Sequence, residues 1–385
     1  MCGGVEMFLL RLCPHLRARG YDVEVLTTEE RGEWFERMAA EVPTSHVEGC
    51  GRFPRASHPL RVGAWLARAR YDAVLLNGDE MAQQSLTMLP DRVVALPIIH
   101  SDSETTYRLN FANADAWNAL VAVGPRIADR ARAQFPARPV VEILHGVPLP
   151  EPAALAGRYP APRDELRIIF VGRIVQHVKN VLLLPEALRR CREAGVNARL
   201  TVAGDGPDLP LLRSRIHELS LAEHVRFVGA VPPEEVYRLL LDHHVLLLPS
   251  FFEGFGLAPL EAQACGCVPV ASRLEGVTTP AMEEGKTGRL VAVGDVAGFA
   301  DALTELGRDP EHWTTMSAAA RAFAAERFSL ERMTDDYARL IDAAVAGRYP
   351  LPRSRRGRLP VDPSMYWRQC VPSWVRAAGR KVLGR

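Results

Sequence analysis

Short apolar segments rich in β-branched residues alternate with amphipathic segments along almost the whole chain. The apolar segments have the length and composition of buried strands, and the amphipathic segments have the 3.6-residue period of helices. This alternation constrains the fold more than any other feature, because parallel strands need crossover helices that cover both faces of their sheet. We therefore expect an α/β protein with two doubly wound domains that face each other across a cleft.

The pattern predicts particular elements. We expect strands at Tyr21–Thr28, Ala73–Leu76, Val93–His100, Ala119–Val123, Val140–Leu144, Arg167–Gly172, Ala198–Ala203, Val225–Val228, Val245–Pro249, Val268–Ala271 and Leu290–Val293. We expect helices at Val5–Arg19, Leu182–Arg192, Leu209–Leu219, Pro233–Leu241 and Leu330–Ala344.

A chain of 385 residues is too long for one ordinary core and suits two domains. The stretch Pro148–Arg163 holds five prolines and no apolar period, which favours a linker between the domains. We expect a first domain over 1–150, a linker over 151–163, a second domain over 164–328, a helical segment over 329–346 and a tail over 347–385. Cys2-Gly3-Gly4 resembles a turn between a strand and a helix, so we also expect a short strand before Met1.

The charge is unevenly distributed. The formal net charge of +1 argues against a nucleic-acid partner for the whole chain. From Gly347 onward, however, ten Lys/Arg stand against one Asp, so the tail carries +9 and the remainder −8. Such a tail could anchor the protein to an anionic membrane, although a charged terminus, or aromatic packing onto the first domain, would explain the same composition. Its aromatic and basic residues are Tyr366, Trp367, Trp374, Arg368, Arg376, Arg380, Lys381 and Arg385.

The cysteines indicate a cellular compartment. They are odd in number and scattered, so neither a disulfide framework nor a zinc site is expected. Cys265-Gly-Cys267 ends an apolar segment, and we interpret both thiols as buried small residues. No secretory segment or run of about 18 apolar residues is present. We expect a cytoplasmic protein, with peripheral contact at the inner face of the membrane if the tail binds there.

A glycine-containing loop separates an apolar strand from a helix in the second half of the chain. In Val245–Ala264, VLLLPSFFEGFGLAPLEAQA, Gly254 and Gly256 precede a helix that we expect to open near Pro259. Backbone N–H groups at a helix N-terminus bind phosphate, and the helix dipole favours negative charge there. The loop is therefore a candidate cradle for a diphosphate.

Two carboxylates, Glu253 and Glu261, bracket this loop eight residues apart. With a diphosphate between them, one could hydrogen-bond a sugar and the other a ribose. An acid that complements the helix dipole would explain Glu261 as well, and a solvated loop acid would explain Glu253. The spacing alone leaves both interpretations open.

Two cations follow a strand in GRIVQHVK. Arg173 and Lys179 lie beyond the carboxyl end of Arg167–Gly172, where doubly wound sheets bind ligands. A leaving nucleoside diphosphate gains negative charge as its bond to the sugar breaks, and fixed cations can stabilise it. Isolated surface charges are the alternative, but a phosphate cradle on a neighbouring element favours donor binding. The glycine turns at Gly204-Asp205 and Gly229 could also approach a ligand, or simply make tight turns.

With these residues assembled, the chain resembles the retaining glycosyltransferases of family four, the glycosyl transferases group 1. The resemblance covers Gly3 to about Ala346 and is strongest over Arg167–Asp295. It is carried by IIFVGRIVQHVKN, LTVAGDGP, VRFVGAV, LLLPSFFEGFGLAPLEAQACGCVPVAS and EEGKTGRLVAVGD. It implies the GT-B fold of two Rossmann-like domains across a cleft, with a final helix, Leu330–Ala344, that crosses back onto the first domain.

The resemblance also implies roles for the donor residues. Arg173 and Lys179 would bind the diphosphate and stabilise it as the leaving group. Glu253 would contact the transferred sugar, and Glu261 would hydrogen-bond the ribose hydroxyls. Val228 and Gly229 would line the base pocket, and the N–H groups of Phe255, Gly256 and Leu257 would hold sugar and phosphate. The other donor-binding candidates are Gly3, Gly4, Gly172, Gly204, Asp205 and Gly254.

In the first domain, His100 of IIHSD matches a family histidine near the transferred sugar, although a structural histidine at a strand end would fit equally. His145 stands where the family usually has Asn, so it could be a plain turn residue. Enzymes of this family use a nucleotide-diphosphate sugar as substrate, without a cofactor or essential metal, and no Asp-x-Asp motif is present. The implied acceptor is a glycan or a lipid-linked molecule, in polysaccharide biosynthesis.

Two other functions are compatible with parts of this pattern. Gly254-Phe-Gly256 before a helix, with Glu275 nineteen residues on, superficially resembles the fingerprint of an NAD-dependent oxidoreductase. That interpretation has Pro259 at the third glycine and leaves Arg173 and Lys179 unexplained. A catalytically silent nucleotide-sugar binding protein is the second alternative, although every expected donor residue is present.

Overall fold

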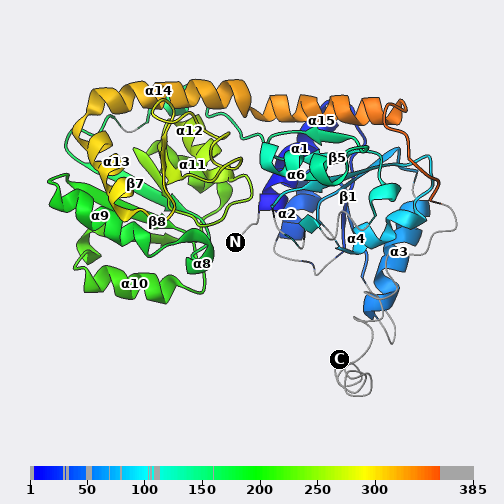
Figure 1. Ribbon diagram of the computed structural model, residues 1–385, viewed down its shortest axis with the longest axis horizontal. Helices are drawn as coiled ribbons and strands as arrows, with labels where there is room; N and C mark the ends of the chain where they lie inside the picture. Colours follow the sequence, from blue (N-terminus) through cyan, green and yellow to red (C-terminus); the bar gives the residue numbers. More distant parts are fainter. Residues whose placement is uncertain are drawn as a thin grey trace, which may run out of the picture. The chain divides into compact units, whose positions relative to one another are not determined.

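The computed structural model describes residues 4–28, 31, 34–48, 54–68, 70–78, 80–102, 104, 106–107, 113–158 and 160–355. They form two compact units (Figure 1). Of the described residues, the C-terminal unit comprises Leu144–Met333 with Gly4 and 124–126. The N-terminal unit comprises the rest of the first 143 residues and the chain from Thr334 onward. The domain and linker boundaries expected from the sequence stay a prediction.

A six-stranded parallel sheet forms the centre of the C-terminal unit, in the order β12-β11-β10-β7-β8-β9. The strands are β7 (Leu166–Val171), β8 (Ala198–Ala203), β9 (Val225–Gly229), β10 (Val245–Leu248), β11 (Val268–Ser272) and β12 (Arg289–Val291). Because β7 pairs with both β8 and β10, the direction of winding reverses between β7 and β10. Ligands of doubly wound sheets bind beyond the carboxyl ends of the strands at such a switch point.

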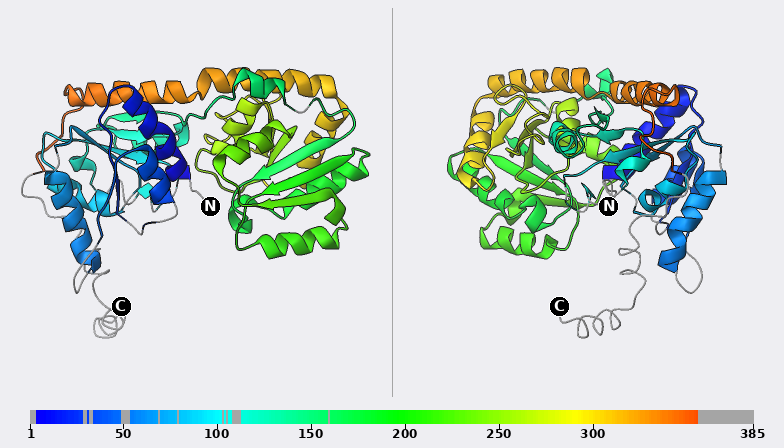
Figure 2. Two further views of the ribbon diagram at one scale, coloured as in Figure 1. Left: turned by 180° about the vertical axis from the view of Figure 1, so that it is seen from behind. Right: turned by 45° about the vertical axis from the view of Figure 1, so that its right-hand side comes forward.

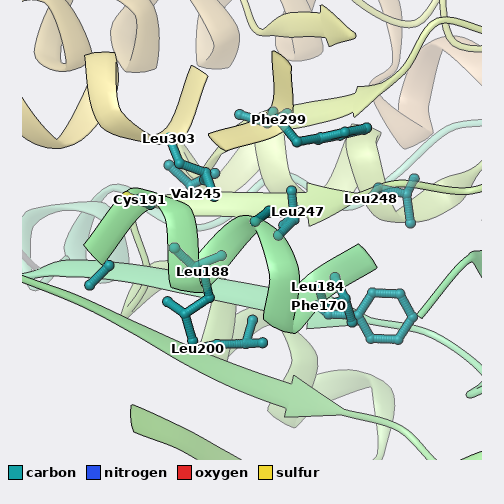
Figure 3. Close-up of a cluster of buried hydrophobic side chains, with 14 of the residues drawn as sticks. Phe170, Leu184, Leu188, Cys191, Leu200, Val245, Leu247, Leu248, Phe299 and Leu303 are labelled. Atoms are coloured by element: carbon teal, nitrogen blue, oxygen red, sulfur yellow. The ribbon is translucent and has the colours of Figure 1, made fainter. Parts of the chain in front are cut away.

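Helices cover both faces of this sheet (Figures 1 and 2). The helices of this unit are α7 (Pro152–Ala156), α8 (Gln176–Lys179), α9 (Leu183–Glu193), α10 (Leu209–Glu218), α11 (Pro233–Leu241), α12 (Leu257–Cys265), α13 (Val296–Arg308) and α14 (Pro310–Arg327). Strand residues alternate between two cores, as a period of two requires. Ile168 and Phe170 pack with α9, α10 and α13, whereas Ile169 packs with α11 and α12. Figure 3 shows Phe170 and Leu247 in the first core, beside Leu188 of α9.

Cys265 and Cys267 are both fully buried and free, which confirms their interpretation as small core residues. Burial raises the pKa of both thiols far above the usual range. A thiol of this kind is inert toward metals and oxidants, because the thiolate is the reactive form.

The N-terminal unit contains two parallel sheets, β1-β2 and β3-β4-β5-β6. Their strands are β1 (Val25–Thr27), β2 (Thr44–His46), β3 (Ala73–Leu76), β4 (Val94–Ile99), β5 (Leu120–Ala122) and β6 (Val140–Glu142). The helices are α1 (Gly4–Ala18), α2 (Trp34–Glu41), α3 (Pro54–Arg68), α4 (Glu80–Ser85), α6 (Pro125–Gln134) and α15 (Leu330–Val345).

The sequence predictions for this unit are partly correct. The helix α1 is confirmed, but the strand expected at Tyr21–Thr28 is only the three residues of β1, and β2 was not predicted. The expected strand before Met1 stays a prediction.

A buried arginine helps to fasten the chain beyond α15 to the rest of the N-terminal unit. The Arg355 guanidinium donates to the carbonyl oxygens of Ala116, Val93 and Pro90 at 2.7, 2.9 and 3.0 Å, and to Asn118 Oδ1 at 3.2 Å. The tail residues Tyr366, Trp367, Trp374, Arg368, Arg376, Arg380, Lys381 and Arg385 lie outside the described residues. Within the described part of the chain, no helix is both long and apolar enough to cross a membrane.

Candidate functional site

The loops that follow β7 and β10 meet at the switch point through one ion pair. Lys179, the last residue of α8, donates from Nζ to Glu253 Oε1 at 2.6 Å. The Ser250 hydroxyl donates to the same oxygen, also at 2.6 Å. The Glu253 carboxylate is only 7% exposed, so both partners compensate for its removal from water. The structure thus brings together two predicted site residues that are 74 positions apart in the chain.

Backbone hydrogen bonds fasten the same two loops. The N–H groups of Phe251 and Phe252 donate to the carbonyl oxygen of Val178 at 2.9 and 3.2 Å. On the β7 side, a Cβ at Gly172 would lie 3.8 Å from Cε of Lys179, so the lysine stem passes beside this glycine. Main-chain hydrogen bonds between the two loops therefore hold Lys179 and Glu253 together, in addition to their own ion pair.

The short helix α8 is fixed at both ends by side chains. At its C-terminal end, Asn180 has φ 49 and ψ 46, a left-handed conformation that asparagine tolerates better than most residues. The Gln176 amide donates to Asn180 Oδ1 at 3.1 Å and accepts from the N–H of Leu182 at 2.9 Å. The N–H of Gln176 donates to Asp208 Oδ2 at 2.7 Å. These bonds set the direction in which Lys179 leaves the helix.

Arg173 lies on the same loop with its side chain exposed. The next residue, Ile174, donates its N–H to the carbonyl oxygen of Asp205 at 2.8 Å, and Gly204 donates to the carbonyl oxygen of Gly229 at 2.7 Å. The loops after β7, β8 and β9 are therefore joined in one row. In the described part of the chain, the Arg173 guanidinium has no ion-pair partner.

The glycine loop opens directly onto a helix N-terminus. The helix α12 begins at Leu257, so Pro259 lies in its first turn and the predicted start near Pro259 is confirmed. Gly256 is the N-cap residue, with φ 78 and no side chain to cap the helix. Proline is accommodated because the N–H groups of a first turn have no partner within the helix. The first N–H groups of α12 can therefore bind an anion.

The buried side chain of Phe255 packs beneath the glycine loop into the core of the C-terminal unit. Its side chain is 2% exposed and packs on the rings of His145 and Phe328, with centroid distances of 6.3 and 6.2 Å. His145 is itself buried, so it contributes to packing beside the glycine loop. Gly254 and Leu257, on either side, are half-buried.

Glu261 lies on α12, a turn beyond the loop, and is 9% exposed. Burial, and then the negative charge of Glu261 four residues earlier in the helix, raise the pKa of the Cys265 thiol. Val228, near the end of β9, is half-buried against the core that includes α12. The predicted contacts of Glu261 with ribose and of Val228 with a base stay predictions.

Three predicted site residues, His100, Gly3 and Gly4, are not part of the loops that follow β7 and β10. His100 follows β4 in the N-terminal unit, donates from Nε2 to Asn77 Oδ1 at 3.0 Å, and packs edge-on against Phe8 at 4.9 Å. Gly4 is the exposed first residue of α1, and Gly3 lies outside the described residues. The proposed roles of these three residues stay predictions. Among the described residues, no group of three or more His, Cys, Asp or Glu could hold a metal ion.

Two contributors to the site were not predicted from the sequence. Ser250 is 1% exposed, and the Val178 carbonyl receives two N–H groups of the opposite loop. The position of Ser250, at a buried strand end three residues before a candidate carboxylate, was the available signal. The partner of a backbone carbonyl leaves no mark in a sequence.

The arrangement is that of an α/β unit of GT-B type, and comparisons with known proteins agree. The family model of glycosyl transferases group 1 matches residues 155–323, and that of the glycosyl transferase 4-like domain matches residues 3–101. The phosphatidyl-myo-inositol mannosyltransferase of Mycobacterium leprae is 30% identical over 80% of this chain and 84% of the relative. The chain belongs to the glycosyltransferases of group 1.

Other similar proteins fit this assignment. The D-inositol 3-phosphate glycosyltransferase of Mycobacterium avium is 28% identical, over 86% of this chain and 87% of the relative. Among solved structures, Anabaena HepE with UDP and glucose has a TM-score of 0.72 at 18% identity, covering 89% of this chain and 96% of that one. Sucrose-phosphate synthase of Thermosynechococcus elongatus has a TM-score of 0.73 at 20% identity, covering 90% and 94%. At these identities the solved structures support the GT-B fold alone.

Proposed function

We propose that this glycosyltransferase moves a hexosyl group from a nucleoside diphosphate sugar to its acceptor with retention of anomeric configuration and without an essential metal. The observation that carries the proposal is the Lys179–Glu253 pair, which lies at the switch point beside the uncapped N-terminus of α12. Cations and helix N–H groups together can stabilise a diphosphate leaving group as its charge develops.

Each group has a chemical task in this reaction. The exposed guanidinium of Arg173 and the ammonium of Lys179 bind the diphosphate oxygens. Glu253 accepts a hydrogen bond from a hydroxyl of the transferred sugar, and Glu261 accepts from the ribose. The acceptor oxygen attacks the anomeric carbon on the face from which the diphosphate departs. Its proton passes to the departing phosphate oxygen while the bond between that oxygen and the anomeric carbon breaks.

Inositol phosphates, free or lipid-linked, are the acceptor class that we propose first. Two relatives are named for phosphatidyl-myo-inositol and for D-inositol 3-phosphate, and each matches at least four-fifths of this chain. The N-acetyl-alpha-D-glucosaminyl L-malate synthase of Bacillus anthracis matches only 37% of this chain, so its acceptor is a weaker guide. If the basic tail binds anionic membranes, the lipid-linked acceptor is the favoured one.

Nucleotide binding tests the proposed donor site. Titration calorimetry with UDP, GDP, ADP and NAD should detect one preferred nucleoside diphosphate, bound equally well with EDTA present. Arg173→Ala and Glu261→Ala should each weaken this binding by about ten-fold, since each removes a hydrogen bond to a charged group. Ligand at about 100 times its Kd should stabilise the wild type by about 2.7 kcal/mol. Binding of NAD alone, or equal affinity in both variants, would instead favour an oxidoreductase or a site elsewhere.

A further inference from the structure

Ser250 combines three properties that bear on the candidate site. It is 1% exposed, it lies two residues beyond the end of β10, and its hydroxyl donates at 2.6 Å to the carboxylate oxygen that also accepts from Lys179. The hydrogen bond spans only three residues, so Ser250 and Glu253 belong to one turn. That turn is held from outside by the Val178 carbonyl, which accepts from Phe251 and Phe252.

The two partners of Glu253 differ in what they can do during donor binding. Lys179 has a flexible four-carbon stem and is 19% exposed, so its ammonium can turn from the carboxylate toward a diphosphate. The Ser250 hydroxyl has no such freedom, because its side chain has one rotatable bond and lies within the protein. When Lys179 moves, the hydroxyl is the contact that stays on Glu253.

We propose that Ser250 is a positioning residue that holds the Glu253 carboxylate in place when Lys179 exchanges its ion pair for the donor diphosphate. This inference rests on the proposed function, because it requires Lys179 to bind the diphosphate and Glu253 to contact the transferred sugar. In the donor-free protein, Lys179 and Ser250 share one oxygen of Glu253. In the donor complex, Ser250 alone orients that oxygen toward the sugar hydroxyl. A misplaced carboxylate then lowers turnover more than it lowers nucleotide affinity.

The structure offers a matched control in Ser317. This serine is also 1% exposed, and its hydroxyl donates a single hydrogen bond, to the carbonyl oxygen of Gly266 at 2.7 Å. Replacement by alanine at either position removes one buried hydroxyl and one hydrogen bond, so Ser317→Ala measures the effect of such a loss outside the site. A difference between them in turnover then reports the role of Ser250 in the site.

The test compares Ser250→Ala, Ser250→Thr and Ser317→Ala in kcat, in KM for the donor sugar and in Kd for the nucleoside diphosphate found by calorimetry. Ser250→Ala should lower kcat by about ten-fold, as expected for one hydrogen bond to a charged group, with Kd changed by less than about two-fold. Ser250→Thr should restore most of the loss, because it keeps the hydroxyl. Ser317→Ala should leave kcat at the wild-type value.

A double-mutant cycle tests whether Ser250 acts through the Glu253 carboxylate. In a Glu253→Gln background, Ser250→Ala should have little further effect on kcat, because its effect acts through the carboxylate. Equal losses of kcat in Ser250→Ala and Ser317→Ala, no rescue by threonine, or additivity with Glu253→Gln would each overturn the assignment. Failure of the proposed function is a different result: the wild type would then bind no nucleoside diphosphate at all.

Discussion

Lys179→Met should lower kcat by about 10²–10³-fold and leave the protein folded. The variant lacks one fixed hydrogen-bond donor that stabilises the charge developing in the transition state. Removing such a donor raises the activation free energy by about 3–4 kcal/mol. Methionine keeps an unbranched stem of similar length, so the packing of Lys179 beside Gly172 changes little. The Ser250 hydroxyl still satisfies Glu253 Oε1 in this variant, which limits the cost of leaving the carboxylate without its cation. Steady-state kinetics at saturating donor measure the effect.

Lys286→Met is the control for charge alone. Lys286 also donates to a glutamate at 2.6 Å, but its ion pair with Glu283 lies on the surface, with side-chain exposures of 69% and 44%. A surface pair of this kind contributes little to stability and has no place in the proposed site. We expect its kcat to equal that of the wild type. A kcat of Lys179→Met within about three-fold of this control would exclude Lys179 from leaving-group stabilisation.

Gly206→Ala should destabilise the protein by about 3 kcal/mol and weaken nucleotide binding with it. A Cβ at this position would lie 2.3 Å from the carbonyl oxygen of Ile174. The obstacle is main chain, so it cannot move aside as a flexible side chain does. It would push away the loop that Ile174 N–H and the Asp205 carbonyl hold together at 2.8 Å. Because Arg173 precedes Ile174, the guanidinium would be displaced from the diphosphate.

Urea unfolding and nucleotide calorimetry of the same samples check this expectation. Gly157→Ala is the matched control, because its φ of −83 suits alanine and the nearest atom to the new Cβ would be 3.7 Å away. The free energy of unfolding of Gly157→Ala should match that of the wild type to within about 0.5 kcal/mol. Gly206→Ala with wild-type stability and affinity would show that the loops after β7 and β8 need not touch for the site to form.

The C-terminal unit was predictable because its signals are local. The strands β7 to β12 are short apolar runs bounded by glycine, proline or polar residues, and the boundaries of β8 and α11 agree with prediction to the residue. The unpredicted strand β2 has the sequence Thr-Ser-His and is half-exposed throughout, so it carries neither apolar alternation nor an apolar run. The strand predicted at Tyr21–Thr28 was too long because only Val25–Thr27 pair with β2.

The candidate site was predictable in its residues but not in its contacts. Arg173, Lys179, Glu253 and Glu261 follow strands or flank a glycine loop, and both signals are visible in the sequence. That Lys179 meets Glu253 depends on β7 lying next to β10, although two other strands separate them in the chain. Sheet order is set by tertiary packing, so the ion pair and the role of Ser250 required the structure.

The most direct test of the central claim is a transfer assay in EDTA. The purified protein is incubated with the preferred nucleoside diphosphate sugar and an inositol phosphate or phosphatidylinositol vesicles, and product is followed by proton NMR. We predict stoichiometric release of the nucleoside diphosphate, unaffected by EDTA, and a glycoside with the anomeric configuration of the donor. A glycoside of inverted configuration, or activity abolished by EDTA, would contradict the proposed mechanism. Tight nucleotide binding without transfer to any acceptor would contradict the assignment as an active glycosyltransferase.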